Sequence, residues 1–84
     1  MKILIIKKRN LLDYKDWPIW KCDKSEFDWQ YDEEEHCYIL DGSVTVIGPE
    51  NTVDIQPGDY VIFPKDLKCV WKVHEPIKKH YTFK

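Results

Sequence analysis

Two side chains of the sequence combine a reactive group with a pattern typical of a buried site, Glu35 and Cys69. Glu35 ends the acidic run 32–35 and alternates in step with Cys37 and Ile39. On a strand, this alternation places all three side chains on one face. A carboxyl group among apolar neighbours suits general acid or base catalysis, because burial disfavours its charged form. The alternative is a structural glutamate held by hydrogen bonds.

Cys69 alternates with Trp71 and Val73, so the thiol is also expected to face inward. Buried cysteines usually behave as small, inert apolar residues, and only the thiolate is a nucleophile. A thiol beside a carboxylate therefore needs a nearby cation before it can react. Lys65 and His80 are the candidates for that cation.

Composition excludes several classes of protein. The three cysteines, Cys22, Cys37 and Cys69, form no C-x-x-C pair, which predicts free thiols in a reducing compartment. Thirteen basic and fifteen acidic residues leave a net charge of −2, which disfavours nucleic acid as a partner. The apolar start 1–6 is too short for a signal peptide or a membrane span. We expect a cytoplasmic protein without a membrane partner.

Short alternating segments separated by turn residues predict a single all-β domain over residues 1–84. Asp41-Gly42 predicts a two-residue hairpin turn, and Pro76 predicts a strand break. The only expected helical turn lies in 10–17, with Asn10 as its N-cap and Pro18 after its end. Eight or nine strands are expected: 2–6, 20–23, 27–31, 35–40, 43–47, 52–56, 59–63, 68–74 and 77–83.

Aromatic residues gather on one face of the expected barrel. Phe27, Trp29 and Tyr31 alternate with Glu26, Asp28, Gln30 and Asp32, so the three rings share a surface. Aromatic side chains at this period are usually core. With room left between them, they would instead line a pocket for a small polar organic molecule. The ligand-binding residues expected on this basis are Trp20, at the mouth, and Trp29, Tyr31, Phe63, Trp71 and His80.

Two segments resemble the conserved motifs of the cupin superfamily. Glu35 and Gly42 stand at the glutamate-to-glycine spacing of the first motif, and 57–64, Pro-Gly-Asp-Tyr-Val-Ile-Phe-Pro, is similar to the start of the second. Cys69 then occupies the position of the second motif's histidine. The chain most resembles the small single-domain cupins of the ethanolamine-utilisation and ureidoglycine-processing group (DUF861-like), through 17–20, 35–42, 63–65, 69–71 and 79–81. This resemblance implies a single-domain cupin jelly-roll β-barrel.

Cupin metal sites use three histidines and one glutamate, and the resemblance implies that most are replaced here. Counting three spacer residues back from Glu35 places the first two ligand positions at Trp29 and Tyr31, while counting four gives Asp28 and Gln30. Strand parity favours the first count, which leaves Glu35 and Cys69 as the only natural ligands. A catalytic zinc site usually has three protein ligands. We therefore expect no metal and no other cofactor.

Three functions remain open on this sequence. The first is a metal-independent enzyme with Glu35 as acid or base and Cys69 as thiol. The second is a non-catalytic cupin that binds or senses a small molecule, and the third is a structural domain with a filled barrel. A chain of 84 residues buries a limited core, which also favours a homodimer.

Overall fold

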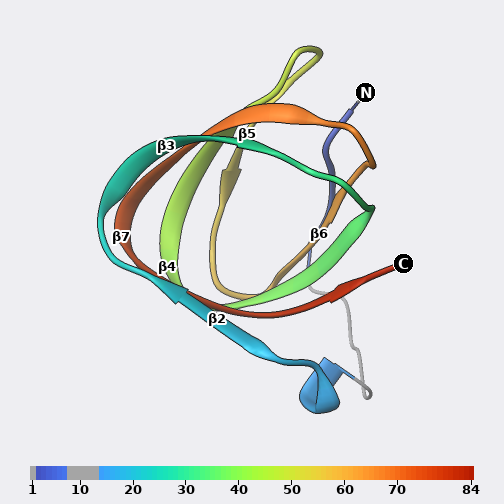
Figure 1. Ribbon diagram of the computed structural model, residues 1–84. Coiled ribbons are helices and arrows are strands. Elements are labelled where there is room, and N and C mark those ends of the chain that lie inside the picture. Colours follow the sequence, from blue (N-terminus) through green and yellow to red (C-terminus); the bar gives the residue numbers. More distant parts are fainter. Residues whose placement is uncertain (1, 8–13) are drawn as a thin grey trace.

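The computed structural model describes residues 2–7 and 14–84, which are built almost entirely of β-strands (Figure 1). The expected all-β fold is confirmed, with one turn of 3-10 helix, η1 (Tyr14–Asp16), before Pro18. The expected cap Asn10 lies outside the described residues. The strands are β1 (Leu4–Lys7), β2 (Ile19–Cys22), β3 (Ser25–Gln30), β4 (Glu35–Ile47), β5 (Thr52–Ile55), β6 (Asp59–Phe63) and β7 (Lys68–Phe83).

Two long strands, β4 and β7, run through both faces of the barrel (Figure 1). The first half of β4 pairs with β6 and with the second half of β7, so that Cys37 lies opposite Val61 and Tyr81. Its second half pairs with β5 and with the first half of β7. The seven strands form one sheet with the order β1-β6-β4-β7-β2, in which β5 pairs in addition with β4 and β3 pairs with β7. All pairs are antiparallel, and the main ladder begins at β1 and ends at β2 without closing.

The hairpin predicted at Asp41-Gly42 and the break predicted at Pro76 are both wrong. β4 continues through the first and β7 through the second, so the described residues form seven strands instead of eight or nine. The register between β4 and β7 shifts at 39–44, as at a β-bulge, where strands typically bend. Gly42 has φ +95°, and a Cβ there would lie 2.3 Å from the carbonyl oxygen of Pro76. Glycine is thus needed for a bulge and a close backbone contact, and not for a turn.

The core fills the space that the curved sheet encloses, mainly with inward side chains of β4, β6 and β7. Alternate residues are buried along β4, as in Cys37, Ile39, Val44 and Val46, whereas most residues of β6 are buried. None of the helices among the described residues is long and apolar enough to cross a membrane. Burial is less complete at the end of the barrel where β3 and the second half of β7 carry aromatic rings, and this is where the candidate site lies.

Candidate functional site

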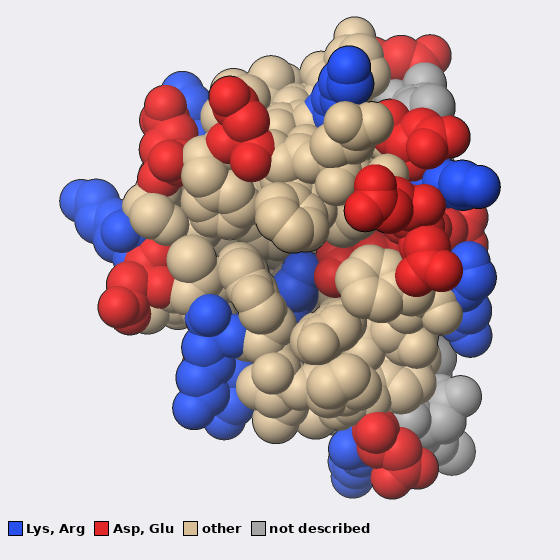
Figure 2. Space-filling view, viewed as in Figure 1, with Lys and Arg blue, Asp and Glu red and all other residues tan. Residues whose placement is uncertain are grey.

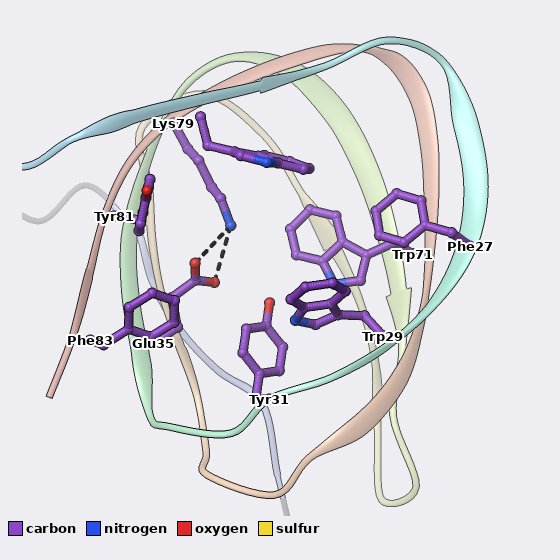
Figure 3. A pocket seen from close by; sticks show the side chains of 9 residues that line it. Phe27, Trp29, Tyr31, Glu35, Trp71, Lys79, Tyr81 and Phe83 are labelled. Atoms are coloured by element: carbon purple, nitrogen blue, oxygen red, sulfur yellow. Dashed lines mark hydrogen bonds and ion pairs between the residues drawn. The ribbon is translucent and has the colours of Figure 1, made fainter.

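A cavity of about 260 Å³ opens at one end of the barrel. In the space-filling view this face is hollowed near its centre, with Lys or Arg atoms at the base of the hollow (Figure 2). The cavity is lined mainly by aromatic rings, with one acidic and one basic side chain among them (Figure 3). The lining residues are Trp20, Phe27, Trp29, Tyr31, Glu35, Trp71, Lys79, Tyr81 and Phe83.

The two charged residues of this lining form a buried ion pair. Lys79 Nζ donates hydrogen bonds to both carboxylate oxygens of Glu35, at 3.0 Å each. Both side chains are only 5% exposed. The first residue of β4 and the second half of β7 bring these groups together, because the backbones of the two strands pair antiparallel and both side chains point inward (Figure 3). The expectation that Glu35 faces the barrel interior is confirmed.

Aromatic faces surround the Lys79 ammonium. Its Nζ lies 4.9 Å from the ring centroid of Trp20 and 4.7 Å from that of Trp71. The two indoles meet edge to face, at 5.9 Å between centroids, and Phe27 stacks on Trp71. Cation–π attraction and the carboxylate together compensate the ammonium for its lost water. The site therefore holds a fixed positive charge in a largely apolar surrounding.

Tyr31 contributes a hydroxyl group that points toward the Glu35 carboxylate (Figure 3). Its ring stacks on Phe63, with 4.9 Å between centroids, and the residue is 3% exposed. Burial, reinforced by the charge of Glu35, raises the pKa of Tyr31 well above its ordinary value. The phenol consequently stays protonated at any physiological pH and acts as a hydrogen-bond donor.

The two inward thiols do not join this ion pair. Cys69 is buried, but it does not line the cavity. Its Sγ lies 3.7 Å from the Trp29 carbonyl oxygen, and the residue borders a separate surface depression. Burial raises its pKa to about 11, and that of the fully buried Cys37 to about 12. Both thiols are therefore protonated near neutral pH, which disfavours the proposed nucleophilic role of Cys69. The cation was expected to be Lys65 or His80, but Lys65 is exposed, and the cation that contacts Glu35 is Lys79.

The other predicted site residues divide into three groups. Trp20, Trp29, Tyr31 and Trp71 line the cavity as expected, and Trp29, 51% exposed, lies at its solvent side. Phe63 is fully buried behind Tyr31 and does not reach the cavity. The expected placement of His80 is wrong: its parity on β7 is opposite to that of Lys79, and its Nδ1 contacts the Trp17 carbonyl oxygen at 2.9 Å.

Four lining residues were not predicted as site residues: Phe27, Lys79, Tyr81 and Phe83. Phe27 belongs to the aromatic face already recognised on β3. The three residues of β7 share the odd-numbered phase of Cys69 and Trp71, which continues past Pro76 because the strand does not break there. If the strand had been predicted as continuous, its alternation would have placed these three residues inside the barrel. A lysine is rarely predicted to be buried, however, unless the acidic residue that pairs with it is known.

The residues at the cupin ligand positions do not fit a metal ion of the family's usual kind. Trp29 has no ligating atom, Tyr31 holds its proton, and both oxygens of Glu35 are engaged by Lys79. Cys69 holds its proton as well. Across residues 2–7 and 14–84, no group of three or more His, Cys, Asp or Glu side chains is arranged to hold a metal.

Comparisons with known proteins agree with this architecture. A DUF861 family protein from Thermotoga maritima is 44% identical, with a TM-score of 0.92 over 99% of this chain and 100% of its own. A putative ethanolamine utilization protein Q from Salmonella typhimurium (21% identity, TM-score 0.68) and the EutQ protein of Clostridium difficile (24%, 0.68) share the fold. Each match covers 75% of this chain and about half of the relative, 51% and 50%. A search of functionally curated proteins found no match. The family model for the EutQ-like cupin domain matches residues 10–81, and the chain belongs to this family of cupins.

Proposed function

We propose that this cupin binds a small organic molecule in the cavity around Glu35 and Lys79. The observation that carries the proposal is a buried ion pair at an opening lined by aromatic rings. Pockets of this composition bind ligands through apolar area, with a few polar groups that fix orientation. The aromatic walls would take a flat or apolar body, and the ion pair would take one polar group of the ligand.

The hydrogen-bonding capacity of the site favours a ligand with both donor and acceptor character. Lys79 uses two of its ammonium protons on Glu35, which leaves one for a ligand acceptor. Each carboxylate oxygen accepts more than one hydrogen bond, so Glu35 also has capacity for a ligand donor. The Tyr31 phenol supplies a further donor at the same place. A hydroxyl, carbonyl or amide group fits this arrangement better than a fully ionised one.

A filled structural barrel is the competing function. A cavity of about 260 Å³ weighs against it, since an engineered apolar cavity of roughly 150 Å³ already binds benzene. An enzyme that uses Glu35 as acid or base is compatible with the same site, because its carboxylate already accepts a hydrogen bond from Lys79. Binding is therefore the primary proposal, and turnover requires its own test.

A thermal-shift screen of small metabolites tests the proposal. A ligand at 100 times its dissociation constant stabilises the native state by about 2.7 kcal/mol, which raises the melting temperature of a small domain by about 10 °C or more. The matched control is the double variant Glu35→Leu/Lys79→Met, which replaces the ion pair by apolar groups of similar size. Compounds that stabilise the wild type and not the variant support the proposal. No stabilising compound in a broad library, or equal shifts in both proteins, would contradict it.

A further inference from the structure

We infer that Lys79 is a nucleophile that forms an imine with a small aldehyde or ketone bound in the cavity, with Glu35 as its proton acceptor and donor. This inference rests on the proposed function and names its substrate class as carbonyl compounds. It is carried by the geometry of one amine, one carboxylate and one cavity, and not by any metal or cofactor.

Lys79 differs from every other lysine that the structure describes. Among the lysines whose side-chain exposure the structure describes, it is the only buried one, at 4% exposure, and the others are exposed or half-buried. Lys72, for comparison, has a side chain that is 42% exposed and a carboxylate at 3.9 Å. Lysines that act as nucleophiles on carbonyl groups are typically desolvated in apolar pockets, because loss of hydration favours the neutral amine.

Glu35 provides the proton transfer that the reaction needs. Its oxygens lie 3.0 Å from Lys79 Nζ, so a proton can move along an existing hydrogen bond. The rings of Trp20 and Trp71 leave the ammonium little access to water. Proton transfer between the two groups therefore needs no intervening water molecule.

The reaction begins when the Lys79 ammonium gives a proton to Glu35. The free amine attacks the carbonyl carbon, so that a C–N bond forms and the π electrons of the carbonyl group move to its oxygen. This oxygen takes the proton from Glu35, which gives a carbinolamine. The nitrogen then passes a second proton to Glu35. The hydroxyl group leaves as water with that proton, and a C=N bond forms. The products are a protonated imine, one water molecule and the Glu35 carboxylate, so charge and atoms balance.

Reductive trapping with benzaldehyde tests the inference. Benzaldehyde is close in size to benzene, which fits a cavity of roughly 150 Å³, and this cavity measures about 260 Å³. The native protein is incubated with benzaldehyde and sodium cyanoborohydride at neutral pH, digested, and analysed by mass spectrometry for benzylated lysines. We expect Lys79 to be labelled at least about tenfold faster than any other lysine, because the site orients the amine and moves its proton. In urea-denatured protein this preference is expected to disappear.

Two variants and one non-carbonyl analogue separate the possible causes. Glu35→Gln is expected to slow labelling of Lys79 about tenfold or more, since the proton acceptor is lost. Lys79→Arg keeps a cation and is expected to abolish labelling at this position. Benzyl alcohol, which forms no imine, reports binding alone.

The outcomes distinguish this inference from the proposed function. Labelling of Lys79 in native protein at the rate of surface lysines would overturn the imine, whether or not either variant folds. If benzyl alcohol binds in the cavity while Lys79 is not preferentially labelled, the imine is refuted and the binding function stands. If the metabolite screen also finds no ligand, both are refuted.

Discussion

Removal of one partner of the Glu35–Lys79 pair is expected to destabilise the protein more than removal of both. Lys79→Met leaves a carboxylate that is 5% exposed and has lost its hydrogen-bonding cation. Breaking a buried pair in this way costs about 3–5 kcal/mol, whereas replacing both partners by apolar side chains is often neutral or stabilising. A domain of 84 residues has a total stability of about 4–13 kcal/mol, so the single variant loses a large part of it.

Urea denaturation of wild type, Glu35→Leu, Lys79→Met and the double variant measures this as a double-mutant cycle. All four proteins are measured at the same pH, between 7 and 8. We expect each single variant to lose about 3 kcal/mol or more and the double variant to return to within about 2 kcal/mol of wild type. Losses below about 1 kcal/mol in both single variants would refute a dry, buried pair, since that is the range of exposed salt bridges.

Four further predictions concern two glycines, Cys69 and the exposed face of β1. Gly42→Ala should lower the free energy of unfolding by more than about 3 kcal/mol in urea denaturation, because its new Cβ would lie 2.3 Å from the Pro76 carbonyl oxygen. Gly58→Ala, with φ +92° but nothing within 4 Å of its new Cβ, should lower it by only about 1–2 kcal/mol. Equal losses would exclude the close contact at Gly42. The pKa of Cys69, raised from 9.0 to about 11, should slow its alkylation by iodoacetamide at pH 8 by about 100-fold relative to denatured protein. In the unfolded chain the Cys69 thiol loses its proton at a lower pH than in the folded protein, so the free energy of unfolding should fall as the pH rises from about 9 to 11. If the wild type and Cys69→Ala show the same dependence of stability on pH, this prediction is contradicted. We also propose a homodimer through β1, which among the described strands pairs only with β6 and exposes Leu4 and Ile6 (50% and 39%). Light scattering should give twice 10.2 kDa for the wild type and 10.2 kDa for the variant Leu4→Lys/Ile6→Lys. A monomeric wild type would refute the proposed dimer.

Local patterns in the sequence were sufficient for the fold class and for most strands. The turns on either side of 59–63 predicted a strand with the bounds of β6, and the aromatic face of 27–31 correctly predicted part of the wall of the cavity. The same local signals failed at Asp41-Gly42 and Pro76, because a glycine with positive φ and a proline serve a bulge as well as a turn. The partner strand decides between them, and strand pairing is not visible locally.

Only one of the two charged residues of the candidate site was predictable from the sequence. Glu35 was found from its parity, but its partner Lys79 lies 44 residues away in the sequence. Cys69 was predicted as the partner of Glu35 because it occupies a motif position. Its side chain points inward from β7 but lies in a different part of the barrel from the cavity. The position of a charge relative to another strand depends on register, which the shifts at 39–44 make impossible to count from the sequence.

The binding site itself is tested most directly by NMR of the tryptophan indole N–H groups during a titration with benzyl alcohol. The chain has four tryptophans, of which Trp20, Trp29 and Trp71 line the cavity. Trp17 does not, and packs instead near Tyr60, at 6.3 Å between centroids. We predict that the three cavity signals move with a common saturation curve while the Trp17 signal stays in place. Movement of Trp17 alone, or of none of the four signals, would contradict a ligand site at Glu35 and Lys79.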